Sequence, residues 1–316
     1  PGYCLSYSPD VSLNDLDYSI NLILHGSYWT TPPLQEYGPV QVGGNNAMYL
    51  PHGYFVAGKS WSFIQEQVLA MKELNVKYQY ANVGIFNEKG VIPDSQYTQL
   101  ANWVQNSKVI DPDQMVIALV NGHQRSHVWN EEIHSEMAET CFTIIESTGV
   151  DGLHFDFEPP RSDPELINFL KKVRQVVGED VHLSIAGSGA PYRWDSAHIK
   201  EVGKYVDSVC PMLYDNSKAI HTVDGYKQWV QEALVHYNII YETPGLRKGI
   251  EVLPILPAYT ANEWHDPEIA NLQVAIEAIH KLNTVRMEGI GVWWWYEMTE
   301  QDKQTMKTDF VDVYGH

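Results

Sequence analysis

The sequence contains few cysteines, few basic residues and no long apolar run. Three cysteines among 316 residues are too few and too widely spaced for a disulfide framework or a zinc finger. The 21 basic residues are outnumbered by 40 acidic ones, and the net charge of −19 disfavours nucleic acid and anionic membrane as partners. No apolar run approaches the roughly 20 residues that span a bilayer. These absences favour a globular protein that takes a neutral or cationic ligand.

The sequence also lacks a glycine-rich phosphate turn after any predicted strand, so a nucleotide-binding open sheet is disfavoured and no cofactor is expected. A hydrophobic content of 44% with 19% charged residues is typical of a globular protein with a sizeable core. Ten tryptophans and nineteen tyrosines provide flat apolar faces of the kind that sugar-binding sites use.

Short apolar runs alternate with longer amphipathic stretches along the chain. The runs predict strands at 19–26, 76–87, 115–123, 149–160, 181–189, 208–216, 249–259 and 289–298. The amphipathic stretches predict helices at 61–75, 95–110, 130–149, 163–178, 195–206, 223–237 and 271–288, and a last one closes the chain. Eight strands, each followed by a helix, predict an α/β protein with one (β/α)8 barrel domain over residues 1–316.

Two connections of this predicted barrel indicate the shape of a site. The first strand-to-helix connection, about 26–60, is expected to be a long loop rich in Tyr, Trp, Gly and Pro, and such loops usually serve binding. The connection after the seventh strand is short, at 260–270. An open groove with one aromatic wall favours endo-cleavage of a glycan or polysaccharide chain.

The segment GVDGLHFDFEPP (149–160) alternates large apolar residues with His154, Asp156 and Glu158. A period of two predicts a strand, and the helices outside a barrel should cover its apolar face. The three ionisable side chains must then point into the barrel, where burial is costly unless they are paired or functional. Glu158 comes last, at the carboxyl end of the strand, where barrel enzymes hold their catalytic groups.

Three segments resemble motifs of glycoside hydrolase family 18, the chitinases and endo-β-N-acetylglucosaminidases. DGLHFDFE (151–158) is similar to that family's Asp-Gly-x-Asp-x-Asp-x-Glu, with His154 in place of an aspartate. MLYD (212–215) resembles Met-x-Tyr-Asp, and GVWWW (291–295) resembles the terminal Gly-x-x-x-Trp. VNGH (120–123) is only loosely similar to the family's Ser-x-Gly-Gly.

The resemblance implies a retaining glycoside hydrolase whose substrate supplies the nucleophile, an exception to the scheme with two carboxylates. Glu158 would be the general acid and base. Asp156 would hold the 2-acetamido N–H, stabilise the oxazolinium cation and raise the pKa of Glu158. Tyr214 would donate to the acetamido oxygen, and Asp215 would bond nearby sugar hydroxyls.

The resemblance also implies residues that bind substrate. Trp295 would lie at the floor of the sugar site. Trp293, two residues earlier on the predicted strand, would point to the same face. Met212 and Asn121 would line the site through their motifs. His154 would hydrogen-bond Asp156 and titrate near pH 6.5, where an aspartate would not. Secretion is implied too, although no basic segment followed by an apolar one opens the chain at Pro1.

Three other functions remain open from the sequence. His123 and His127 are four residues apart and could bind a metal ion in a hydrolase, with His154, Asp156 and Glu158 as possible further ligands. The two histidines are expected in a loop rather than on a helix, where this spacing ligates zinc best. A non-catalytic sugar-binding protein could share the barrel, but Glu158 is retained. A glycosidase for sugars without an acetamido group is the third alternative, and His154 is its main support.

Overall fold

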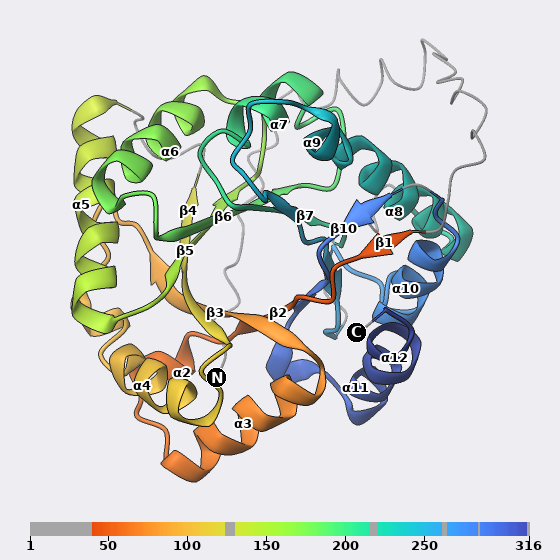
Figure 1. Ribbon diagram of the computed structural model, residues 1–316, viewed down its shortest axis with the longest axis horizontal. Coiled ribbons are helices and arrows are strands. Elements are labelled where there is room, and N and C mark those ends of the chain that lie inside the picture. The colour runs from red at the N-terminus through yellow and green to blue at the C-terminus, as the bar shows by residue number, and fades with distance from the viewer. Residues whose placement is uncertain (1–39, 124–129, 215–219, 261–263, 284, 315–316) are drawn as a thin grey trace. The chain divides into compact units, whose positions relative to one another are not determined.

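The computed structural model describes residues 40–123, 130–214, 220–260, 264–283 and 285–314. They belong to one compact unit, Gly38–His316, and the other unit, Pro1–Tyr37, lies outside the described residues. Parallel strands of this unit form a ring that helices surround (Figure 1). Among the helices that the structure describes, none has the length and apolar character that a membrane crossing requires.

The ring follows the order β6–β5–β4–β3–β2–β11–β9–β7–β8, and the pairing of β6 with β7 closes it. Its strands are β2 Asn46–Leu50, β3 Val76–Ile85, β4 Met115–His123, β5 Gly152–Glu158, β6 His182–Ser188, β7 Ser208–Met212, β8 Glu251–Val252, β9 Ile255–Pro257 and β11 Gly291–Trp293. β8 and β9 both pair with β7 and occupy one position of the ring. Eight positions of parallel strands confirm the predicted α/β class and (β/α)8 barrel.

Helices connect successive strands around the outside of the ring. The longer ones are α3 Trp61–Glu73, α4 Leu100–Ile110, α5 Glu131–Thr148, α6 Pro164–Val177, α7 Ser196–Val202, α8 Val223–Tyr237, α10 Leu272–His280 and α11 Glu300–Thr305. Short turns of helix are α2 Gly53–Val56, η1 Asp94–Gln96, α9 Ile239–Glu242, η2 Trp295–Glu297 and α12 Asp312–Tyr314, and η3 Met306–Val311 continues α11. The predicted helix 271–288 is too long, because β10 Arg286–Met287 instead pairs with β1 Gln41–Val42.

The sequence marks several helix ends directly. Asn130 caps α5, since its side chain accepts a hydrogen bond from the Ile133 N–H at 2.9 Å. Gly149 ends α5 with a φ of 71°, a left-handed conformation that glycine adopts at little cost. Asp163 caps α6 in the same way, accepting from the Glu165 N–H at 3.0 Å.

The first barrel strand differs from the prediction. Residues 46–50 form β2, which pairs with β3 and β11 and completes the ring, so the expectation of one loop over 26–60 is wrong there. The predicted strand 19–26 lies outside the described residues. All five residues of β2 are buried, and a strand covered on both faces shows no period of two. Residues 51–60 are all that connect β2 to α3.

The core has two layers, one outside the strands and one inside the ring. Leu153, Phe155 and Phe157 belong to the outer layer, as predicted, and the Phe155 ring lies 5.1 Å from that of Phe169 on α6. The inner layer is rich in aromatic and sulfur-containing side chains, among them Tyr49, Tyr80 and Met212. His154 and Asp156 are buried polar residues of the barrel strand β5.

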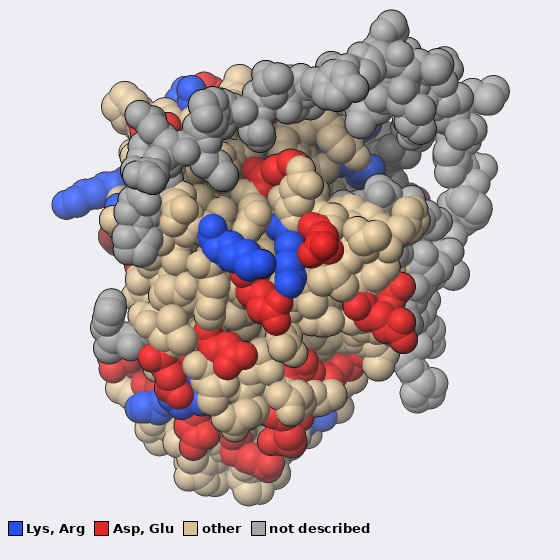
Figure 2. Space-filling model, turned by 90° about the vertical axis from the view of Figure 1, so that its right-hand side faces the viewer, with Lys and Arg blue, Asp and Glu red and all other residues tan. Residues whose placement is uncertain are grey.

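The surface reflects the excess of acidic residues. On the face in Figure 2, acidic side chains spread over a wide area, and the basic side chains near its centre lie beside acidic ones. No broad basic region is visible among the described atoms of this face.

Candidate active site

The strand β5 places its ionisable residues at successive heights in the barrel. Its register with β4 sets His154 beside Leu119, Asp156 beside Asn121 and Glu158 beside His123. Glu158 is the last residue of the strand and is half-buried, whereas Asp156 is 7% exposed and His154 is fully buried. Two carboxyl groups therefore come from the end of one strand, at the face where barrel enzymes carry out their chemistry.

Asp156 is a buried carboxyl group with an unused acceptor. Its Oδ1 atom has no hydrogen-bond partner among the described residues. Burial raises the pKa of Asp156 to about 6, because the charged form loses its hydration. Buried polar atoms are nearly always paired in native proteins, so this oxygen can still accept a hydrogen bond from a ligand or a water molecule.

His154 has two partners, and Asp156 is neither of them. Its Nε2 lies 3.2 Å from the Tyr49 hydroxyl, and its Nδ1 lies 2.9 Å from Ser184 Oγ. Ser184 Oγ in turn donates to the Leu153 carbonyl at 3.3 Å. Because Ser184 gives its proton to Leu153, its oxygen accepts from Nδ1, and Nε2 of the neutral ring is left to accept from the Tyr49 hydroxyl, which burial keeps protonated by raising its pKa. The Nδ1–H then donates to Ser184.

The expected bond between His154 and Asp156 is therefore wrong for this structure. Burial lowers the pKa of His154 to about 3, so the imidazole is neutral at the pH values where most enzymes work. Its ring stacks on Tyr80 at a centroid distance of 4.3 Å and an angle of 26°. His154 fills the barrel interior and does not titrate near pH 6.5.

This assignment predicts the behaviour of His154→Asn. The variant should lose about 1–3 kcal/mol of stability, because it leaves buried partners unsatisfied. Both limbs of its pH–rate profile should stay where they are in the unsubstituted protein, since no titration of the histidine is removed. Stopped assays across pH 4–9 would measure this, and a displaced limb would contradict the neutral imidazole.

Aromatic rings form the other side of the site. Trp293, the last residue of β11, lies 5.3 Å from the Tyr49 ring and stacks near Tyr214 at 6.2 Å and 15°. Tyr214 lies two residues beyond the end of β7, and its ring is 5.9 Å from that of Tyr259. The structure thus brings Trp293 and Tyr214 together, and adds Tyr49, whose strand the sequence pattern did not reveal.

Trp295 occupies a different place from the one predicted. It is 3% exposed, belongs to the outer core layer, and donates its indole N–H to Gln67 Oε1 on α3 at 2.8 Å. The strand ends at Trp293 and the turn η2 begins at Trp295. The alternation of side chains between the two faces of the strand therefore does not extend to Trp295. The prediction of Trp295 at the floor of the sugar site is wrong, and Trp293 has the position near Tyr214.

A matched pair of substitutions tests this exchange of roles. Trp295→Phe should lower the free energy of unfolding by about 1–2 kcal/mol, since a buried hydrogen bond and packing are lost, with kcat/KM nearly unchanged. Trp293→Phe should lower kcat/KM about tenfold. Thermal melts and initial rates give both quantities. The opposite pattern would return Trp295 to the site.

The remaining predicted residues are only partly described. Asn121 donates to Asn82 Oδ1 at 3.0 Å and to the Gly84 carbonyl at 3.1 Å, which fixes its side chain between β4 and β3. Met212 ends β7 in the inner layer. Asp215 and His127 lie outside the described residues, as does the side chain of His123. Over the described ranges, no group of three or more His, Cys, Asp or Glu side chains is arranged to hold a metal ion.

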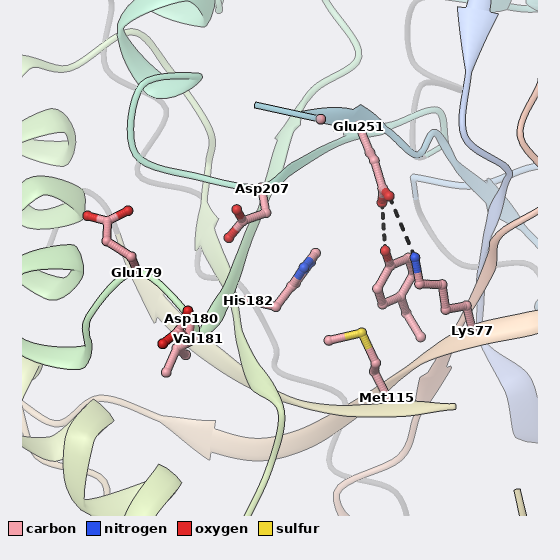
Figure 3. A pocket seen from close by; sticks show the side chains of 10 residues that line it. Lys77, Met115, Glu179, Asp180, Val181, His182, Asp207 and Glu251 are labelled. Atoms are coloured by element: carbon pink, nitrogen blue, oxygen red, sulfur yellow. Dashed lines mark hydrogen bonds and ion pairs between the residues drawn. The ribbon is translucent and has the colours of Figure 1, made fainter. Parts of the chain in front are cut away.

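Two cavities lie at the opposite end of the barrel, where the strands begin. One, of about 270 Å³, is lined by Lys77, Tyr78, His182 and Glu251, among others (Figure 3). Glu251 accepts from the Tyr78 hydroxyl at 2.8 Å and lies 3.7 Å from Lys77 Nζ. The other, of about 420 Å³, shares Lys77 with it. In the first cavity, Glu251 is already bonded to protein side chains and lies far from the carboxyl ends of the strands. We therefore infer that this first cavity has a structural role in the barrel.

Known proteins resemble this chain in sequence and in fold. Endochitinase 1 of Metarhizium anisopliae is 30% identical over 95 residues, which are 26% of this chain and 22% of that protein. A chitinase-like effector of Moniliophthora perniciosa is 24% identical over 203 residues, 55% of this chain and 44% of that protein. The chain thus matches less than half the length of these two relatives.

A crystal structure of a chitinase from Bacteroides thetaiotaomicron shares the fold, with a TM-score of 0.60 and 10% identity over 86% of this chain and 98% of that one. Residues 53–309 match the sequence model of glycosyl hydrolases family 18. That match includes the strand with Asp156 and Glu158 and the aromatic strand end at Trp293. The chain therefore belongs to glycosyl hydrolases family 18.

Proposed function

We propose that this protein is a secreted, endo-acting glycoside hydrolase that cleaves chains of β-linked N-acetylhexosamine with retention. One observation carries the proposal. The strand β5 holds Glu158 at the mouth of the barrel and buries Asp156 two residues deeper, where Oδ1 has no hydrogen-bond partner among the residues that the structure describes. The name of the first relative, an endochitinase, supports the same substrate class.

In the proposed reaction, Glu158 donates its proton to the glycosidic oxygen while the acetamido oxygen of the same sugar attacks the anomeric carbon. The bond to the leaving sugar breaks and an oxazolinium forms. Asp156 accepts the acetamido N–H and stabilises the positive charge, which its Oδ1 is available to do. The Glu158 carboxylate then takes a proton from water, and the water oxygen adds to the anomeric carbon as the bond from that carbon to the acetamido oxygen breaks, with net retention.

The aromatic side of the site supports sugar binding. Trp293 and Tyr214 have nearly parallel rings, and both are only partly buried. Flat rings of this kind combine apolar faces with polar edges and suit a pyranose ring. The Tyr214 hydroxyl is proposed to donate to the acetamido oxygen, as the resemblance implies.

The anomeric form of the first product tests this mechanism. NMR should show the β-anomer when an N-acetylglucosamine oligomer is cleaved, and a thiazoline analogue of the intermediate should inhibit far more strongly than the sugar itself. Oligomers with a 2-hydroxyl in place of the acetamido group should be inert, because they carry no internal nucleophile. An α-anomer, or cleavage of a plain glucan, would replace this proposal by a glycosidase for sugars without an acetamido group.

A second candidate is a sugar-binding protein without turnover. It is favoured by the hydrogen bonds of His154 to Tyr49 and Ser184, because the histidine that replaces the family's aspartate does not bond Asp156. The relative named a chitinase-like effector is compatible with this alternative. Calorimetric binding of an N-acetylglucosamine hexamer that stays intact for hours would establish it in place of the hydrolase.

A further inference from the structure

Exposed tryptophan and tyrosine side chains gather at one end of the barrel. Among the large hydrophobic side chains that the described residues expose, four are of these types: Trp61 at 45%, Tyr192 at 69%, Trp264 at 40% and Tyr296 at 54%. Three of them lie in the segments that follow β6, β9 and β11, and Trp61 begins the helix that follows β2. Segments that follow barrel strands lie at the carboxyl ends of those strands, the end that holds Glu158.

Tyr296 is continuous with the aromatic side of the proposed site. Its ring lies 5.9 Å from that of Trp294, at an angle of 69°. Trp294 in turn stacks on Trp293 at 4.1 Å and 21°. A path of touching rings therefore leads from the proposed site of cleavage outward to an exposed phenol.

The exposed ring of Tyr296 is held in place. Its hydroxyl donates to Glu297 Oε1 at 2.8 Å. Glu297 Oε2 accepts from the Thr260 N–H at 3.0 Å and from its hydroxyl at 3.1 Å. The connection after β9 thereby fixes the turn after β11, and a ring that is already oriented loses little conformational freedom when a ligand covers it.

The surroundings of Tyr296 favour an uncharged ligand. The adjacent carboxylate, Glu297, already accepts three hydrogen bonds from neutral donors, so its oxygens are engaged and the surface offers ring faces to a ligand. We propose that Trp294 and Tyr296 form a second sugar-binding platform, outside the point of cleavage. It would take further units of the β-linked hexosamine chain whose scissile bond lies at Glu158. This inference rests on the proposed function and deepens it, since it makes a polymer rather than a short oligomer the preferred ligand.

The test compares ligands of two lengths. In the Glu158→Gln background, where neither ligand should be cleaved, calorimetry would measure the affinities for the β-1,4-linked trimer and hexamer of N-acetylglucosamine. Tyr296→Ala should lower the ratio of hexamer to trimer affinity at least about fivefold. Tyr296→Phe retains the ring and should keep most of that ratio. Phe142→Ala removes an exposed ring (39%) on α5 and should leave it unchanged.

The proposed platform is contradicted if Tyr296→Ala leaves the ratio of hexamer to trimer affinity unchanged. It is also contradicted if Tyr296→Phe lowers this ratio as much as the alanine variant does. Absence of binding to both oligomers overturns it too. Failure of the proposed function looks different, because it shows as intact oligomers after incubation with the unsubstituted protein while the affinity ratio still depends on Tyr296.

Discussion

Glu158→Gln is expected to lower kcat on N-acetylglucosamine oligomers at least about a hundredfold and to leave the fold intact. The amide has nearly the shape of the carboxyl group, but it can neither give a proton to the leaving oxygen nor take one from water. General acid–base catalysis by one side chain typically contributes about 10²–10⁴ in rate. Because Glu158 is half-buried at the very end of β5, its replacement should disturb little packing.

The control for this variant is Glu139→Gln, which makes the same chemical change at an exposed position on α5. Its rate and melting temperature should match those of the unsubstituted protein. If Glu158→Gln kept more than about a tenth of the rate, another group would have to be the acid, and the proposed mechanism would fail.

Asp156→Asn should stabilise the protein at neutral pH while lowering turnover about a hundredfold. The native carboxyl group is buried, and burial raises its pKa from 3.8 to about 6. Its protonated form is thus favoured by folding. That contribution is complete below pH 3.8 and is lost as the pH rises toward 6, so at pH 7 an ionised, poorly solvated carboxylate costs stability. A shift of this size corresponds to a gain on the order of 2–3 kcal/mol for the asparagine variant.

The pH dependence makes this prediction specific. The difference in unfolding free energy between Asp156→Asn and the unsubstituted protein should be small near pH 4, should grow up to about pH 6 and should then stay constant. Denaturant titrations at several pH values would measure it. Asp113→Asn, at an exposed aspartate, should show no such growth. A difference that is constant over the whole range would mean that Asp156 does not carry the shifted pKa.

The barrel and its strand β5 could be predicted from the sequence because both follow a regular spacing of apolar residues. In β5, Phe155 and Phe157 alternate with Asp156 and Glu158, and the helices outside decide which set faces inward. Cap residues such as Asn130 gave helix starts for an equally local reason. Local chemistry was sufficient wherever one residue pattern corresponds to one backbone arrangement.

The sequence failed where the structure depends on distant partners. The strand β2 is five residues long and buried on both faces, so only its pairing with β3 and β11 identifies it as a strand. Tyr49 was missed with it. The bonds of His154 to Tyr49 and Ser184 likewise join three strands, which no spacing along the chain reveals. Trp295 was misplaced because β11 ends earlier than its run of tryptophans suggests.

The pairing of β2 with β11 also constrains how the protein is made. Gly291 pairs with Ala47, so the ring closes only after the last barrel strand has left the ribosome. Until then β2 presents an unpaired edge, and such edges are templates for aggregation. Contacts between distant parts of a chain also slow folding. Truncation before Gly291 should therefore yield an open, aggregation-prone sheet rather than a smaller barrel.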